Sequence, residues 1–274
     1  MIAKLTVSLV AILLLSSLAT SCSSGGNGSQ SSNGSGGSSL PASTTVLYIH
    51  HSTGGVIWGG GVPEGITAYN TAHGKNYAIE ELAYPDVPYP WANYPYDYWH
   101  LWVEGGGQAA SEGVPTLETL AQNHDVIVFK HCFPVSSIAA DTGAPSVSSS
   151  TKSIENYKLQ YNALKTRLRQ MSGKRFVVWT GAALLAAEST PEQGARSREF
   201  FTWVKNVWDE PGDNIFVWDF FELETEGGNF LIPGYAAGDS HPSNAFATTV
   251  APFFVNRLVD VIEGRGDTGS LTGK

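Results

Sequence analysis

Cysteine and basic residues are scarce in this 274-residue chain, which has two Cys and 16 Lys and Arg against 25 Asp and Glu. The formal net charge of −9 leaves no basic excess to neutralise phosphates, which argues against a nucleic-acid partner. Charged residues make up only 15% of the chain and apolar residues 42%, a balance that excludes disorder over most of its length. The length favours one domain, or at most two.

The N-terminus lacks an apolar run long enough to span a bilayer, because its run over residues 5–15 covers only about half of the ~20 residues required. Lys4 precedes the run and small residues follow it, a pattern typical of a secretory signal peptide over residues 1–21. The next residues, LATSC, resemble a bacterial lipobox that ends at Cys22. We therefore expect an extracytoplasmic lipoprotein that meets the membrane only through a lipid on Cys22; free secretion is the alternative.

Residues 22–43 are predicted to be a flexible tether, because residues 22–39 are almost purely Ser, Gly, Asn and Gln and cannot bury apolar surface. If Cys22 carries a lipid, Cys132 is the only thiol left, and no intramolecular disulfide can form. The folded domain is expected to span residues 44–264, followed by a loose tail over 265–274.

Short apolar runs with little polar alternation predict buried parallel strands at 46–50, 125–130, 175–180 and 214–220, with a weaker candidate at 77–82. Helical periodicity lies between and after them, over residues 154–171, from Pro191 onward, and over residues 244–262. Gly173 is expected to stop the first helix, and Thr190 and Gln193 to form a capping box for the second. The alternation predicts a three-layer α/β/α sandwich with a mostly parallel five-stranded sheet in the order 2-1-3-4-5.

In such a sheet, sites form beyond the carboxyl ends of the strands where the winding reverses, which is here between the first and third strands. The loops that start there carry His50-His51-Ser52-Thr53-Gly54-Gly55 and Lys130-His131-Cys132. A third polar segment, Gly238-Asp239-Ser240-His241-Pro242, precedes the last helix.

These segments predict a serine hydrolase. Ser52 lies where a strand turns into a helix, and a serine nucleophile needs a base, for which His241 is the best candidate. Asp239 is placed to orient the imidazole. The backbone N–H groups after Ser52, at Thr53 and Gly54, are candidate oxyanion donors. The alternative role for Ser52 is a helix N-cap.

A serine after the first strand of an α/β sandwich, with Asp-X-His-Pro before the C-terminal helix, resembles the SGNH (GDSL-like) hydrolase superfamily. The resemblance implies ester hydrolysis through an acyl-enzyme without a cofactor, with Ser52 as nucleophile, His241 as base and Asp239 as acid. The chain has His51 where the family has Asp, a gap of two rather than three between Asp239 and His241, and no Asn after the third strand of the sheet. Further oxyanion or substrate contacts are therefore expected from Gly106, His51 or His131, with Lys130 as another possible donor.

Two other interpretations use the same residues. His50 or His51, His131, Asp239 and His241 are potential ligands of a catalytic zinc. The segment 84–102 holds eight aromatic residues. They either pack this segment against the body of the domain or, because aromatic faces stack on sugar rings, contact a glycan partner. The substrate is thus expected to be a small-molecule or glycan ester, such as an acetylated sugar. The non-catalytic alternative is a surface lipoprotein that binds glycan through the aromatic segment.

Overall fold

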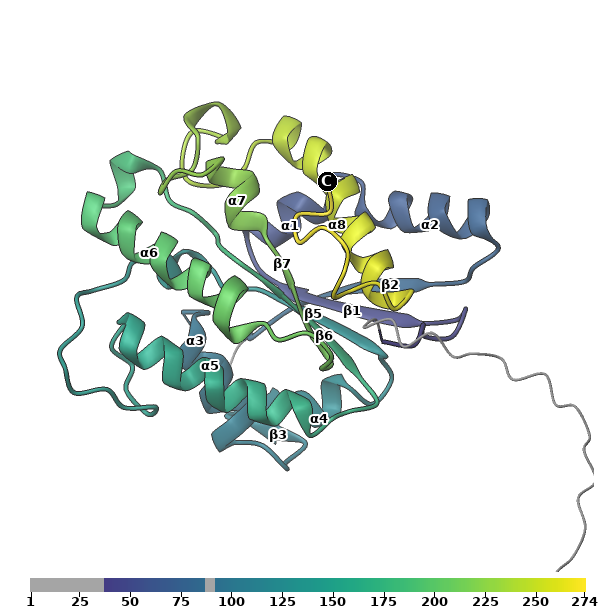
Figure 1. Cartoon of the computed structure of the whole chain (residues 1–274), viewed down its shortest axis with the longest axis horizontal. Coiled ribbons are helices and arrows are strands. Elements are labelled where there is room, and N and C mark those ends of the chain that lie inside the picture. The colour runs from purple at the N-terminus through teal and green to yellow at the C-terminus, as the bar shows by residue number, and fades with distance from the viewer. Residues whose placement is uncertain (1–36, 87–91) are drawn as a thin grey trace, which may run out of the picture. The chain divides into compact units, whose positions relative to one another are not determined.

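The computed structural model describes residues 37–86 and 92–274 and contains a five-stranded parallel sheet (Figure 1). Its order is β2-β1-β5-β6-β7, and every neighbouring pair is parallel. This confirms the predicted sheet and its order. The strands are β1 (Thr45–His50), β2 (Ala78–Ala83), β5 (Val126–Phe129), β6 (Arg175–Trp179) and β7 (Ile215–Trp218).

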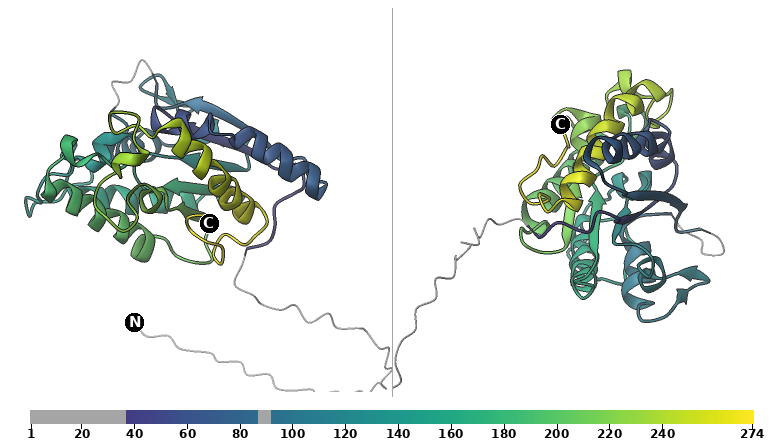
Figure 2. Two further views of the ribbon diagram at one scale, coloured as in Figure 1. Left: turned by 90° about the horizontal axis from the view of Figure 1, so that it is seen from above. Right: turned by 90° about the vertical axis from the view of Figure 1, so that its right-hand side faces the viewer.

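Helices cover both faces of this sheet, as the two turned views in Figure 2 show. One face carries α1 (Thr53–Trp58), α2 (Val62–His73) and α8 (Asn244–Ile262). The other carries α3 (Pro95–Trp99), α5 (Ile154–Arg169) and α6 (Pro191–Trp203), of which α3 and α6 continue as the π-helical turns His100–Glu104 and Val204–Trp208. Smaller elements complete the domain: a hairpin of β3 (Ala110–Ser111) and β4 (Val114–Pro115), the helices α4 (Leu117–Leu120) and α7 (Phe220–Thr225), and 3₁₀ turns at Phe133–Ser136, Ala186–Glu188 and Pro233–Tyr235.

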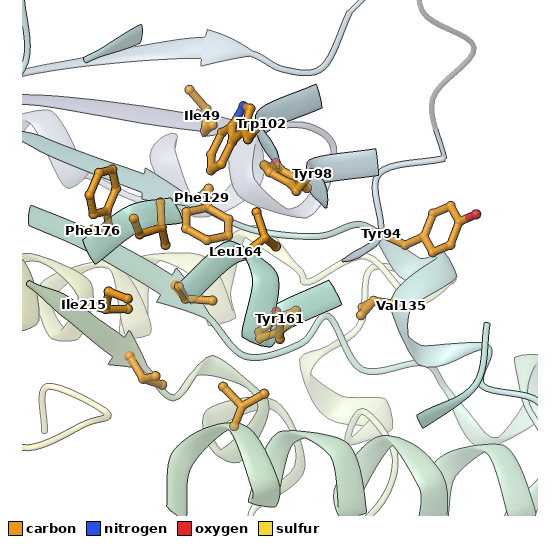
Figure 3. Close-up of a cluster of buried hydrophobic side chains, with 14 of the residues drawn as sticks. Ile49, Tyr94, Tyr98, Trp102, Phe129, Val135, Tyr161, Leu164, Phe176 and Ile215 are labelled. Carbon is orange, nitrogen blue, oxygen red and sulfur yellow. The ribbon is translucent and has the colours of Figure 1, made fainter. Parts of the chain in front are cut away.

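Alternate side chains of each central strand enter different core clusters, as expected for a sheet that is buried on both faces. In β5, Ile127 and Phe129 pack with α3 and α5, whereas Val126 and Val128 pack with α8. Figure 3 shows the first cluster around Phe129. Lys130 follows Phe129. Because side chains along a strand point alternately to the two faces of the sheet, its side chain is expected on the face that α1 and α8 cover.

The predicted helix ends agree closely with the structure. The side chains of Thr190 and Gln193 form the capping box of α6, and α8 has the predicted bounds. The helix α5 ends at Arg169, before the predicted glycine stop. The helix α8 is long and apolar enough to cross a membrane. However, 61% of its most apolar 18-residue stretch is buried inside the domain, as in the core helix of a folded domain.

Most of the described part of the aromatic segment is packed into the core, as the packing interpretation predicts. The indole of Trp102 donates to Tyr84 Oη at 2.6 Å, and the phenol of Tyr98 donates to the Lys130 carbonyl at 2.9 Å. Tyr96 is half-buried, while Tyr89 and Trp91 lie outside the described residues. Five of the eight rings are buried: Tyr84, Tyr94, Tyr98, Trp99 and Trp102.

The C-terminal tail is packed against the domain, so the prediction of a loose tail is wrong. The Leu271 carbonyl accepts a hydrogen bond from the Asp219 amide at 2.8 Å, and the Thr272 carbonyl accepts one from the Trp218 indole at 3.0 Å. At the other end, the Leu40 amide donates to the Ile262 carbonyl at 2.8 Å, so part of the predicted tether also contacts the domain. The predicted signal peptide, Cys22 and the rest of the tether lie outside the described residues.

Replacing Phe129 by alanine tests the packing of the central strand. The Phe129 ring is 1% exposed and contacts Tyr98 and Trp102 with centroid separations of 5.2 and 5.1 Å. Phe129→Ala should lower the free energy of unfolding by about 3–5 kcal/mol, because it leaves a cavity. Urea denaturation measures this free energy. In the same measurement Val207→Ala, at a side chain that is 59% exposed, should change the free energy of unfolding by less than about 0.5 kcal/mol. Equal effects of the two substitutions would contradict this packing.

Candidate active site

Ser52 occupies a strained turn between β1 and α1. Its φ of 54° and ψ of −114° are unusual for a residue with a side chain, and such conformations persist only where the surrounding structure imposes them. Ser52 stands at the N-cap position of α1, but its side chain makes no capping hydrogen bond. The hydroxyl is therefore left for another partner.

The tightness of this turn depends on Gly54. A Cβ at this position would lie 2.5 Å from His50 Cβ and 2.6 Å from the Tyr48 hydroxyl oxygen, well inside van der Waals contact. Only glycine therefore lets the first turn of α1 approach the end of β1 this closely. The sequence analysis considered only the backbone N–H of Gly54, whereas the structure shows that the absence of a side chain at this position is a packing requirement.

The loop before α8 brings His241 to Ser52 from 189 positions away. The Ala237 amide donates to the His241 carbonyl at 2.8 Å and closes a tight turn, in which Gly238 has a φ of 117°. The buried Ser240 hydroxyl donates to Glu188 at 2.5 Å and accepts from the Leu185 amide at 2.9 Å. These bonds fix the loop on both sides of the imidazole.

Ser52, His241 and Asp239 form one chain of hydrogen bonds. The Ser52 hydroxyl donates to His241 Nε2 in the tautomer that carries its proton on Nδ1. Nδ1 lies 3.0 Å from both carboxylate oxygens of Asp239. The side chains of His241 and Asp239 are 36% and 60% exposed, so solvent reaches the site.

The spacing of two residues between Asp239 and His241 is compatible with this geometry. The His241 backbone N–H donates to Asp239 Oδ1 at 2.9 Å, so the carboxylate folds back over the turn and meets the ring as well. These hydrogen bonds, first from the backbone N–H and then from the ring, hold the pKa of Asp239 below its usual value. The carboxylate is therefore ionised where it faces Nδ1.

The backbone N–H groups of the turn differ in whether they are free to bind an oxyanion. The Gly54 N–H donates to the His51 carbonyl at 3.0 Å and is thus already used, contrary to its expected role as an oxyanion donor. The N–H groups of Ser52 and Thr53 have no hydrogen-bond partner within the residues that the structure describes. They are the amides beside the hydroxyl that remain for a ligand.

Two predicted contacts lie elsewhere. His131 is fully buried, its Nε2 lies 2.9 Å from the Tyr161 hydroxyl, and burial lowers its pKa to about 3. Gly106 packs against the Trp102 carbonyl and Arg167, near the C-terminal end of α5. The C-terminal end of α5 leads into the amino end of β6, whereas Ser52 follows the carboxyl end of β1. Gly106 therefore lies near the amino ends of the strands, at the opposite end of the sheet from Ser52. Neither residue reaches the site, because sequence spacing shows neither which face of the sheet a side chain enters, as for His131, nor which end of the strands a loop reaches, as for Gly106.

His51 lies next to Ser52 in the chain, but its ring is directed to the loop after β2. Its Nε2 is 2.6 Å from the Pro85 carbonyl oxygen, and burial lowers its pKa. His50 instead contacts Glu81 through Nε2 at 2.8 Å, and burial lowers its pKa to about 3. The histidines proposed as zinc ligands thus have separate partners, and the described part of the chain contains no group of three His, Cys, Asp or Glu side chains arranged to hold a metal.

Phe133 is a site residue that the sequence analysis did not single out. Its half-buried ring packs edge-on against the His241 imidazole, with centroids 5.0 Å apart. It begins the 3₁₀ turn after β5, so its position just past a strand end at the switch point was the available signal. The ring therefore helps to hold the imidazole in place beside Ser52.

Comparisons with known proteins give fold-level likenesses only. No protein-family description and no curated protein sequence matches the chain. Among solved structures, it is similar to a gut microbial diltiazem-metabolizing enzyme, BT4096, at 11% identity and a TM-score of 0.44 over 86% of this chain and 48% of that one. It is also similar to an acetyl xylan esterase, AlAXEase, at 14% identity and a TM-score of 0.42 over 76% and 96%. The chain thus spans about half the length of BT4096, and with TM-scores below 0.5 neither likeness says what it binds or does.

Replacing Gly54 by alanine tests the close approach of α1 to β1. The added methyl group should lower the free energy of unfolding by about 1–3 kcal/mol, because His50 and Tyr48 cannot both move aside. Gly59→Ala is the matched control, since its Cβ would meet nothing closer than 3.5 Å and its φ is −65°. Urea denaturation measures both variants, and a Gly54→Ala protein as stable as Gly59→Ala would refute the contact.

Proposed function

We propose that the protein is a serine esterase that hydrolyses carboxylic esters through an acyl-enzyme. The observation that carries this proposal is the hydrogen-bonded chain of Ser52, His241 and Asp239. It lies on a strained turn whose Ser52 and Thr53 amides have no partner among residues 37–86 and 92–274. A capping serine would bond its own helix, and a structural histidine would be buried. Here the hydroxyl contacts an imidazole that is open to solvent.

Acylation follows from the positions of these groups. Ser52 Oγ attacks the ester carbonyl carbon while its proton passes to His241 Nε2, and the carbonyl oxygen becomes an oxyanion. The Ser52 N–H is the nearest candidate donor to that oxygen, with the Thr53 N–H beside it. Collapse of the tetrahedral intermediate breaks the bond to the alcohol oxygen, which takes the proton from Nε2 and leaves.

Deacylation uses the same groups in the reverse order. Water gives a proton to His241 Nε2 as it attacks the acyl carbon, and the Ser52 oxygen then recovers that proton as the carboxylic acid departs. In both steps the ionised Asp239 stabilises the imidazolium and holds Nδ1 as the donor. No step requires a cofactor.

The proposal extends to the family, the substrate and the location. We assign the chain to the SGNH-like hydrolases on the position of Ser52 after the first strand and of His241 before the last helix. A small-molecule or glycan ester, with acetyl as the acyl group, is the proposed substrate. The proposed location is outside the cytoplasm on a lipid anchor at Cys22. If the folded protein binds glycan but hydrolyses no ester, the non-catalytic alternative, a glycan-binding surface lipoprotein, would be favoured instead.

Replacing Ser52 by alanine tests the nucleophile. The purified protein should hydrolyse p-nitrophenyl acetate and become labelled by a fluorophosphonate at Ser52, whereas Ser52→Ala should lose the label and about 10³-fold or more of kcat. Ser148→Ala, at an exposed serine whose hydroxyl bonds that of Ser146, is the matched control and should retain both. Peptide mass analysis locates the label, and equal turnover by wild type and Ser52→Ala would defeat the esterase assignment.

Replacing Asp239 by asparagine tests the orientation of the imidazole. The amide can still accept from the His241 backbone N–H, but it no longer stabilises an imidazolium. We expect kcat for p-nitrophenyl acetate to fall about tenfold to a hundredfold, less than for a buried triad acid, because this carboxylate is 60% exposed. Asp141→Asn, which removes an exposed carboxylate bonded to the Glu155 amide, should leave kcat unchanged. An unchanged kcat in Asp239→Asn would mean that another group orients His241.

A further inference from the structure

Lys130 is a buried lysine directly below the Ser52 turn. It follows β5, the neighbour of β1 in the sheet, and is only 1% exposed. Its Nζ donates to the His51 carbonyl at 3.2 Å and lies 3.6 Å from Cys132 Sγ. The Tyr98 hydroxyl donates a hydrogen bond to the Lys130 backbone carbonyl at 2.9 Å, so the backbone from which the lysine side chain extends is held as well.

This placement is costly, because a buried amine needs compensation that an apolar side chain would not. No carboxylate lies within ion-pair distance of Nζ anywhere in the described ranges. After the desolvation that lowers the pKa of Lys130, the groups that raise it are first the Cys132 thiol and then the more distant Glu224, which is itself fully buried and whose pKa burial raises well above the usual value. Of its two hydrogen bonds, the one to the His51 carbonyl has the stronger acceptor, because thiol sulfur accepts only weakly.

The His51 carbonyl belongs to the same peptide unit as the Ser52 N–H. That peptide is trans, so its C=O and N–H point in opposite directions. Lys130 and the Gly54 N–H both hold the carbonyl on the inner side of the turn. The Ser52 N–H must then face outward, where it has no partner within the described part of the chain.

We infer that Lys130 is a positioning residue for ester hydrolysis, which aims the Ser52 N–H at the developing oxyanion by fixing the His51 carbonyl. The inference rests on the proposed function. The hydrogen bond from Nζ also polarises the peptide and strengthens its N–H as a donor. Because the oxyanion forms only during the reaction, this effect acts on kcat rather than on substrate binding.

The test compares Lys130→Met with the wild type after fluorophosphonate titration of active sites. Methionine keeps the unbranched chain but removes the donor. Per titrated site, kcat for p-nitrophenyl acetate should fall about tenfold to a hundredfold while KM stays within about twofold. A boronic acid, whose tetrahedral adduct places an oxygen at the oxyanion position, should bind more weakly by a similar factor. Lys130→Arg, which keeps a donor, should recover part of both losses.

Lys165→Met is the matched control, because Lys165 is also a buried lysine that donates to a backbone carbonyl, that of Trp208, but it lies on α5. It should lower stability and leave kcat per site unchanged. If folded Lys130→Met has the wild-type kcat and boronate affinity, the positioning role is overturned and the esterase assignment stands. If fluorophosphonate does not label the wild-type protein, the esterase assignment itself is overturned. If Lys130→Met does not fold, Lys130→Leu, which also lacks a donor, is measured against Lys130→Arg, and equal kcat per site in these two refutes the role.

Discussion

The site depends on the close approach of α1 to the end of β1. Gly54 makes this approach possible, because any side chain there would collide with His50 and Tyr48. The approach forces Ser52 into its strained backbone conformation and turns its hydroxyl away from the helix that it begins. A residue that would otherwise cap a helix is thereby left to bond His241, and that bond makes an acyl-transfer chemistry possible.

The parallel sheet supplies the second constraint. Since β1 and β5 run in the same direction and pair directly, their carboxyl ends place Ser52 above Lys130 and bring Phe133 against His241. The proposed esterase is therefore assembled from three loops that are distant in the chain. Each loop is held by its own backbone bonds, so the positions of the reacting groups do not depend on the exposed side chains of the site alone.

Much of the fold was predictable because it follows from local pattern. Buried parallel strands are short apolar runs, and four such runs predicted β1, β5, β6 and β7. The fifth strand, β2, was the weaker candidate because it is a largely exposed edge strand. The helix α8 was predicted to its ends by its apolar periodicity and flanking loop. The tail was misjudged, and the role of the aromatic segment was left open, for one reason. Proline-rich and glycine-rich stretches lack a period, so only contacts such as Trp102 with Tyr84, or Trp218 with Thr272, reveal that they are packed.

By itself, the sequence determined the α/β sandwich and the pairing of Ser52 with His241 as candidates, since both depend on residue type and on place beside a strand or helix. Only the tertiary structure decided which polar groups reach the site. It placed His131 in the core, Gly106 at the far end of the sheet and Lys130 beneath the nucleophile. Side-chain direction depends on packing across the sheet, and the linear pattern carries no record of those distant neighbours.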